Sequence, residues 1–286
     1  MTEIERVGVV GAGLMGAGIA EVSIRAGRDV IVSEVDEQAA ESGRARIQKS
    51  LDRAVSKDKL GQDDRDAALA RLRVTTELDE LADRQLVIEA IAEDADLKTR
   101  VFSRLDGAVT DPDAILASNT SSIPIAKLAG ATGRPGNVLG IHFFNPVPVL
   151  KLVELVPSLV TDERTVERAS AFATEQLGKQ TIRAQDRSGF VVNALLVPYL
   201  LSAVRMFESG FATAEDIDNG MVLGCAHPMG PLALADLVGL DTLRAIADSM
   251  HEEYKEPVYA APPYLQRMVD AGLKGKKSGH GFYDYE

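Results

Sequence analysis

Arg6-Val7-Gly8-Val9-Val10-Gly11-Ala12-Gly13-Leu14-Met15-Gly16 is the stretch that decides the fold of the first half of the chain. Its first five residues are nearly all apolar, as expected for a parallel strand that is buried on both faces. A helical pattern runs from Ala17 to Ala26 and ends at Gly27, and a second strand is predicted from Val30 to Ser33. The order strand, glycine turn, helix, strand predicts a doubly wound α/β domain.

The glycine turn is typical of a dinucleotide site. Gly11 permits the tight turn, Gly13 lets the backbone approach a pyrophosphate, and Gly16 lets the helix pack on the strand. The helix N-terminus faces the phosphates. Glu34 ends the second strand about 20 residues beyond the glycines, where a carboxylate can bind the ribose 2′-hydroxyl. The predicted cofactor-binding residues are Gly11, Ala12, Gly13, Leu14, Met15, Gly16 and Glu34.

The same carboxylate bears on the choice of cofactor. Glu34 would repel a 2′-phosphate, and no arginine follows it immediately. The sequence therefore favours NAD over NADP. Arg44 and Arg46 lie further along and could be recruited by a 2′-phosphate, which keeps NADP as the alternative.

A highly charged helical pattern fills most of the chain between Ser33 and the next predicted strand, Leu86 to Ala90. Gly61 is expected to end one helix and Asp63 to cap the next, which predicts a helical hairpin arm at about residues 36–73. Basic and hydroxyl side chains recur on one face of its first helix at three- and four-residue spacing. A solvated face is the commoner interpretation of such a stripe, and phosphate binding is the other. The stripe comprises Arg46, Lys49, Ser50, Arg53 and Lys57.

Composition limits the classes of function. A chain of 286 residues favours two domains, and its formal net charge of -12 disfavours nucleic acid or an acidic membrane as a partner. The apolar runs are shorter than the roughly 18 residues that a membrane span needs. Cys225 is the single cysteine and no signal peptide is visible, so a reducing, cytoplasmic location is expected. No histidine pair has metal-ligand spacing, and no metal site is expected.

Three further strands are predicted, Ala114 to Ser118, Val138 to Phe143 and Leu150 to Leu155, and polar residues stand at the carboxyl ends of the first two. Ligands of doubly wound sheets gather outside the carboxyl ends of the strands. His142 lies at such an end, between apolar residues and prolines, where an imidazole can exchange a proton near neutral pH. A hydrogen-bonded core histidine is an equally good interpretation of this residue alone.

Taken together, the motifs resemble the L-3-hydroxyacyl-CoA dehydrogenase family, and most closely its short bacterial branch, the 3-hydroxybutyryl-CoA dehydrogenases. The resemblance spans nearly the whole chain, and the motifs occur in the family's order. They are the glycine turn, Ser118-Asn119-Thr120-Ser121-Ser122, His142-Phe143-Phe144-Asn145-Pro146-Val147-Pro148, Lys151-Leu152-Val153-Glu154, Asp186-Arg187-Ser188-Gly189-Phe190-Val191-Val192-Asn193 and Gly275-Lys276-Lys277-Ser278-Gly279.

The resemblance implies a reversible, NAD-linked oxidation of a 3-hydroxyl group to a ketone on a short-chain acyl-CoA, in fatty acid or butyrate metabolism. His142 would act as the general base, and Glu154 would pair with its imidazole. Ser121 and Asn193 would hydrogen-bond the substrate oxygens.

Further roles follow from the same resemblance. Ser50 and Lys57 match positions that bind coenzyme A, which makes phosphate binding the better interpretation for Lys57. Glu34 is a departure, because many members carry aspartate there. Positions that contact the nucleotide in the family correspond to Glu93, Lys98, Ser121, Asn145 and Lys277.

The second half of the sequence changes to long apolar helical patterns. Ser188 or Asp186 is expected to cap a helix that runs through Asn193 to Glu208, and Thr213 with Asp216 resembles a capping box for the next. The expected architecture is a Rossmann-type domain over residues 1–184 and an all-helical domain over residues 185–286. In the family the second domain carries substrate contacts and the dimer interface, so a homodimer is expected.

Two other functions remain open from the sequence. One is a related dehydrogenase of a free hydroxy acid or sugar acid, against which Lys57 and the basic stripe argue. The other is a redox sensor that binds NAD without turnover. The joint presence of Ser121, His142, Glu154 and Asn193 argues against a sensor, which needs none of them.

Overall fold

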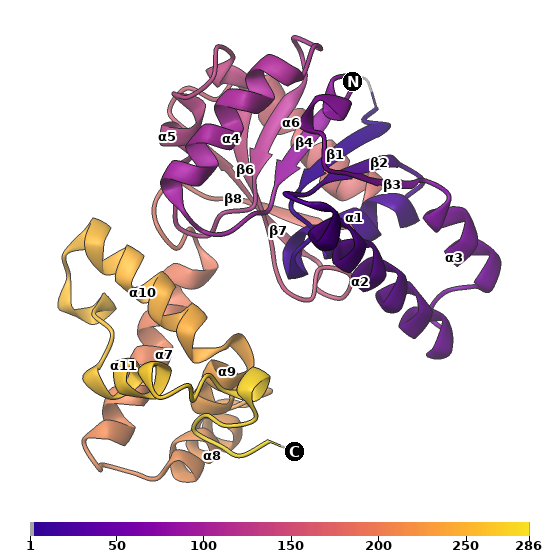
Figure 1. The fold of residues 1–286 in the computed structure, drawn as a ribbon. Coiled ribbons are helices and arrows are strands. Elements are labelled where there is room, and N and C mark those ends of the chain that lie inside the picture. Colours follow the sequence, from indigo (N-terminus) through magenta and orange to yellow (C-terminus); the bar gives the residue numbers. More distant parts are fainter. Residues whose placement is uncertain (1–2, 286) are drawn as a thin grey trace. The chain divides into compact units, whose positions relative to one another are not determined.

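The computed structural model describes residues 3–285, and the chain divides into two compact units, Met1–Asp186 and Arg187–Glu286. The first combines a sheet with helices, and the second is helical (Figure 1). The predicted fold class is thereby confirmed. The boundary expected between residues 184 and 185 lies close to this division.

The first unit is organised around one eight-stranded sheet with the order β3-β2-β1-β4-β5-β6-β7-β8. Strands β1 to β6 run parallel, β7 runs antiparallel to β6, and β8 runs parallel to β7. The chain reverses direction across the sheet between β1 and β4, and ligands of such folds bind at this switch point. The strands are β1 (Arg6–Val10), β2 (Asp29–Ser33), β3 (Leu72–Thr75), β4 (Leu86–Glu89), β5 (Ile115–Ser118), β6 (Val138–Phe143), β7 (Leu152–Pro157) and β8 (Gln180–Arg183).

Helices cover this sheet. Ile19 of α1, Ala68 of α3 and Val166 of α6 belong to one apolar core with the strands, while α4 and α5 pack against each other. A loop separates β5 from the short helix α5, and another loop separates β7 from α6. The helices are α1 (Leu14–Arg25), α2 (Glu37–Ser56), α3 (Gln62–Leu69), α4 (Ala95–Ala108), α5 (Ile125–Ala129) and α6 (Glu163–Ala171).

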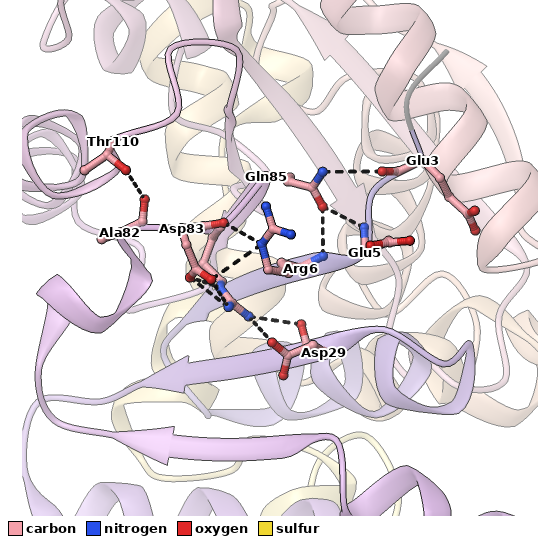
Figure 2. A network of polar contacts seen from close by, with 9 residues as sticks. Glu3, Glu5, Arg6, Asp29, Ala82, Asp83, Gln85 and Thr110 are labelled. Atoms are coloured by element: carbon pink, nitrogen blue, oxygen red, sulfur yellow. Dashed lines mark hydrogen bonds and ion pairs between the residues drawn. The ribbon is translucent and has the colours of Figure 1, made fainter.

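The amino-terminal edge of the sheet is closed by polar contacts (Figure 2). Gln85 accepts through Oε1 from the backbone N–H groups of Glu5, at 2.8 Å, and Arg6, at 3.0 Å. The buried guanidinium of Arg84 pairs with Asp29 at 2.8 Å and with Asp83 at 2.7 Å. These bonds join the starts of β1, β2 and β4, so the carboxyl edge is the end at which polar side chains remain to meet a ligand.

The predicted hairpin arm exists as α2 and α3, but its turn was predicted wrongly. Helix α2 ends at Ser56, because Asp58 takes a left-handed conformation with φ 54°. Gly61 is the extended N-cap of α3 and ends no helix, and Asp63 lies in the first turn of α3. Lys57 becomes the C-cap residue of α2.

Two edge strands escaped the sequence prediction, and one strand was misplaced. Both β3 and β8 are short and half-exposed, so their side chains lack the apolar run that marked the central strands. Strand β7 starts at Leu152 and not at Leu150. The preceding residues form a turn in which the N–H groups of Val149 and Leu150 both donate to the Pro146 carbonyl, at 3.0 Å each.

The second unit is all-helical, as predicted; its only β contacts in the described residues are isolated bridges at His280. Its apolar core is formed by side chains such as Leu201 and Leu243. Across residues 3–285, no helix is both long enough and apolar enough to cross a bilayer. The helices of this unit are α7 (Val192–Glu208), α8 (Ala214–Cys225), α9 (Pro231–Val238), α10 (Leu240–Tyr254) and α11 (Pro263–Asp270).

The predicted cap of α8 is present, and α7 begins further along the chain than predicted. The Thr213 hydroxyl accepts from the N–H of Asp216 at 3.1 Å and caps α8. The N-cap residue of α7 is Val191 and not Ser188 or Asp186, and the side chain of Val191 makes no capping bond. Asp186 accepts from the N–H groups of Ile125, at 2.7 Å, and Ala126, at 2.8 Å, at the start of α5. The sequence could not reveal this partner because it lies about 60 residues earlier in the chain.

Candidate active site

A histidine and a carboxylate face each other at the carboxyl end of β6. His142 and Glu154 are direct partners in the antiparallel register of β6 and β7. The Nδ1 atom of His142 lies 2.7 Å from Oε2 of Glu154, with the histidine 7% exposed and the glutamate 0% exposed. A carboxylate on Nδ1 fixes the imidazole orientation and its tautomer, and it stabilises the ring when the other nitrogen gains a proton. The pairing expected between these two side chains is therefore present.

The loop between the two strands is held by aromatic and cationic contacts. The Phe144 ring meets the His142 imidazole edge-on, with 4.6 Å between centroids. The Lys179 ammonium donates to the carbonyls of Val147, at 2.5 Å, and Leu150, at 2.8 Å. Burial lowers the pKa of Lys179, and the nearby positive charge of Arg25 adds to the effect. These contacts tether the segment that separates the histidine from its carboxylate.

The serine-rich loop after β5 is organised by Glu93. Its Oε1 accepts from the Thr120 hydroxyl at 2.5 Å, the Ser121 N–H at 3.1 Å and the Ser122 hydroxyl at 3.0 Å. Burial opposes ionisation of Glu93, but the Lys98 ammonium and these hydroxyls outweigh it and lower its pKa. An ionised Glu93 thus shapes the loop that carries Ser121.

Asn119 links this loop to the histidine strand, a role that its sequence context did not indicate. Its Oδ1 accepts from the N–H of Phe143, the residue after His142, at 2.8 Å. The only signal for Asn119 in the sequence was its position next to Ser118, at the end of a predicted strand. The bond joins the carboxyl ends of β5 and β6 into one rim.

Beneath the loop lies a buried ion pair. Lys98, 1% exposed, places its ammonium 2.8 Å from Oε1 of Glu89, which is 0% exposed, and 3.0 Å from Oε2 of Glu93. Glu89 also accepts from the Ser118 hydroxyl at 2.6 Å. Lys98, predicted to contact the nucleotide, is thus packed under the rim with carboxylate partners.

The glycine turn fits a dinucleotide. A Cβ on Gly16 would lie 1.9 Å from the Gly11 carbonyl oxygen, so only glycine allows α1 to start this close to β1. Gly11 has φ 93°, and nothing lies within 4 Å of a Cβ placed on Gly13. The Glu34 carboxylate accepts from the N–H of Ala12 at 2.5 Å. The turn, the start of α1 and Glu34 thus form the cradle that a pyrophosphate and a ribose need.

A groove of about 520 Å³ runs between α1, α2 and the loop after β6. It brings Ser50 of α2 together with Asn145, two residues that the resemblance assigns to different ligands. Most of the basic stripe lines it, with Arg46, Lys49 and Arg53 facing one space. Lys57, the last residue of the stripe, is exposed at the C-terminal end of α2.

Two predicted site residues belong to the second unit. Asn193 is buried in the first turn of α7. The Lys277 ammonium pairs with Asp241 at 2.5 Å, and although burial opposes it, this pairing lowers the pKa of the Asp241 carboxyl. Within residues 3–285 no cluster of three or more histidine, cysteine, aspartate or glutamate side chains could hold a metal ion.

A Rossmann sheet with a pyrophosphate cradle and an oriented imidazole at the same carboxyl edge defines a nicotinamide-dependent dehydrogenase. Comparison with known proteins makes the assignment specific. The model for the 3-hydroxyacyl-CoA dehydrogenase NAD binding domain matches residues 6–187, and the model for the C-terminal domain matches residues 189–285. The chain therefore belongs to the 3-hydroxyacyl-CoA dehydrogenase family, as its motifs indicated, and it is an NAD-dependent oxidoreductase.

Individual relatives cover the chain from end to end. A 3-hydroxybutyryl-CoA dehydrogenase of Mycobacterium tuberculosis is 64% identical over 99% of both chains. The mitochondrial hydroxyacyl-coenzyme A dehydrogenase of Homo sapiens is 40% identical over 99% of this chain and 92% of its own. The crystal structure of (S)-3-hydroxybutyryl-CoA dehydrogenase PaaH1 from Ralstonia eutropha superposes with a TM-score of 0.93, at 44% identity over 99% of this chain and 100% of that one.

Proposed function

We propose that the protein interconverts L-3-hydroxybutyryl-CoA and acetoacetyl-CoA, with NAD as the hydride carrier. The observation that carries the proposal is the buried 2.7 Å contact between His142 and Glu154 at the carboxyl edge of a nicotinamide-binding sheet. The relatives named for this substrate are similar over almost the whole chain, which supports the same substrate class here.

In the oxidative direction, His142 takes the proton of the substrate 3-hydroxyl on the ring nitrogen that does not face Glu154. NAD, when bound, supplies the acceptor for the hydride that leaves C3. Glu154 stabilises the resulting imidazolium, since its carboxylate lies on Nδ1. In reduction the same imidazolium returns the proton to the forming hydroxyl.

Two polar side chains hold the substrate oxygens in this proposal. Ser121, on the loop shaped by Glu93, and Asn193, at the start of α7, donate to the oxygen on C3 and to the thioester carbonyl. Cofactor contacts are assigned to the glycine turn, Glu34 and the remaining positions named by the resemblance. Those positions are Glu93, Ser121, Asn145 and Lys277, while Lys98, buried beside Glu89 and Glu93, is proposed to support these contacts from below.

Coenzyme A is proposed to lie along the arm, with Ser50 and Lys57 as its contacts. Replacing Lys57 by alanine is expected to raise KM for acetoacetyl-CoA about two- to fivefold, because an exposed ion pair contributes about 0.2–1 kcal/mol. NADH affinity is expected to stay unchanged, and the effect should shrink at high salt. Steady-state kinetics of Lys57→Ala beside Lys59→Ala, an exposed lysine outside the stripe, measures this. Equal KM values for acetoacetyl-CoA in the two variants would mean that the stripe is a solvated face without a role in binding.

The test of function is a spectrophotometric assay of acetoacetyl-CoA reduction with NADH and, in parallel, NADPH. Reduction with NADH and a much lower rate with NADPH is the expected result. The same assay with free acetoacetate tests the related free-acid dehydrogenase, and longer 3-ketoacyl-CoA chains define the range of substrates. NADH binding without turnover of any ketone would identify a sensor and refute the proposal.

We also propose that the protein is a homodimer through its second unit. Large apolar side chains are exposed there, among them Leu195, Phe211 and Leu223, and a monomer would leave them in water. Sedimentation velocity is expected to give twice the 30.6 kDa mass of the chain. A monomer at micromolar concentration would contradict this. A place in fatty acid or butyrate metabolism, in the cytoplasm, stays a prediction of the resemblance.

A further inference from the structure

Arg46 connects the arm to the glycine turn. From the middle of α2, its Nη1 donates to the carbonyl oxygen of Ala12, 34 residues earlier in the chain. The N–H of the same Ala12 donates to Glu34. Both polar groups of this one residue are therefore held by charged side chains, a cation on the carbonyl and an anion on the N–H. Hydrogen bonds to charged groups are stronger than neutral ones.

Helix α2 is a firm support for this contact. Asp36 caps it by accepting from the N–H of Ala39 at 2.7 Å, and Ile47 and Leu51 are buried in the sheet core. One turn before Arg46, Gly43 packs so closely that an added Cβ would lie 2.2 Å from the Cβ of Ala12. The glycine turn thus meets α2 at two successive points, one steric and one polar.

The contact fixes the direction of the next peptide N–H. In a planar trans peptide the carbonyl and the N–H point in opposite directions. Since the Ala12 carbonyl points at Arg46, the N–H of Gly13 points away from α2. Gly13 is exposed with open space around it, which is where a pyrophosphate oxygen would approach.

We propose that Arg46 is a positioning residue for NAD, which clamps the Ala12 carbonyl and so holds the glycine turn in the form that receives the pyrophosphate. The guanidinium also adds positive charge near the phosphates. Because Arg46 is engaged with the turn and Glu34 occupies the end of β2, Arg46 does not serve as a ligand for a 2′-phosphate. The proposal concerns NAD binding alone and does not depend on the identity of the substrate.

The experiment measures NADH binding directly, by titrating nicotinamide fluorescence on Arg46→Met and Arg44→Met. Arg44 is the matched control: it lies on the same helix, and within residues 3–285 its side chain makes no hydrogen bond or ion pair. Arg46→Met is expected to raise the Kd for NADH about tenfold, equivalent to about 1.4 kcal/mol, near the lower end for a hydrogen bond to a charged group. Arg44→Met should stay within about twofold of wild type.

Two further arms separate this role from others. Arg46→Lys keeps one donor for the Ala12 carbonyl and is expected to recover most of the NADH affinity. The melting temperature of Arg46→Met is expected to stay at the wild-type value, and a lower value would mean that the loss of affinity is merely structural. Where acetoacetyl-CoA is turned over, kcat at saturating NADH should be unchanged while KM for NADH rises. Unchanged NADH affinity in Arg46→Met, or an equal loss in Arg44→Met, would overturn the proposal. A loss of NADPH binding alone in Arg46→Met would also overturn the proposal, because this result would make Arg46 a ligand of the 2′-phosphate.

Discussion

Replacing His142 by glutamine is expected to lower kcat for acetoacetyl-CoA reduction by about 10²- to 10⁴-fold, the usual contribution of a general acid or base. Glutamine approximates the size of the imidazole and can still hydrogen-bond Glu154, but it cannot exchange a proton near neutral pH. NADH affinity should be retained, because the glycine turn and Glu34 follow β1 and β2 and not β6. Stopped-flow or steady-state rates at saturating substrates measure the loss.

The matched control for this variant is His251→Gln, a histidine of α10 in the second unit that has no proposed role. It is expected to leave kcat unchanged. If His142→Gln kept more than about a tenth of the wild-type kcat, His142 would be a core histidine, which is the other interpretation that its sequence context allows.

Glu154→Gln tests whether the two side chains act as one unit. A neutral partner on Nδ1 no longer favours the imidazolium, so kcat should fall although the histidine remains. Groups that act together lose their effects non-additively. The double variant is therefore expected to resemble His142→Gln alone, and fully multiplicative losses would mean that Glu154 acts without His142.

The sequence was most informative where function depends on neighbours along the chain. The glycine turn, the start of α1 and Glu34 are joined by one strand and one helix, so spacing alone predicts their geometry. The pairing of His142 with Glu154 was implied by the family resemblance, and the structure shows its physical basis, because the two residues stand opposite each other in the register of successive strands. In the fold, the central strands were recognisable as buried apolar runs.

Contacts between distant segments were not accessible in this way. Asn119 reaches Phe143 across 24 residues, and Arg46 reaches Ala12 across 34, through atoms of the backbone that carry no sequence signal. The edge strands β3 and β8 were missed for a related reason. They pair on one side only and bury little apolar surface, so hydrogen bonding to β2 and β7 defines them more than composition does.

The ion pair under the serine-rich loop leads to the second large effect. Replacing Lys98 by methionine is expected to lower the free energy of unfolding by about 3–5 kcal/mol, because it leaves the buried Glu89 carboxylate without its cation. Methionine fills nearly the same volume, so the loss reports charge and not a cavity. Urea denaturation at neutral pH, followed by circular dichroism, measures it.

The ionisation of Glu93 makes the difference in the free energy of unfolding between wild type and Lys98→Met depend on pH. Lys98 helps to hold the pKa of Glu93 below the ordinary value of 4.5, despite the opposing effect of burial. The ionised form of Glu93 therefore stabilises the fold above about pH 4.5. This contribution is lost as the pH falls through the lowered pKa, and Lys98→Met lacks the part of it that the Lys98 ammonium supplies. The gap between wild type and variant should therefore be widest near neutrality and should narrow below about pH 4.5.

A second variant separates the two roles that Lys98 could have. The double variant Glu89→Gln/Lys98→Met removes the buried carboxylate together with its ammonium partner. Replacing both members of a buried ion pair often changes the free energy of unfolding little. The double variant should therefore recover much of the stability lost in Lys98→Met. If Lys98→Met instead kept its stability and lost only NADH affinity, the ammonium would contact the nucleotide directly, as the family resemblance implies. With 1% of the lysine exposed and carboxylates at 2.8 and 3.0 Å, the structure favours support of the loop from below.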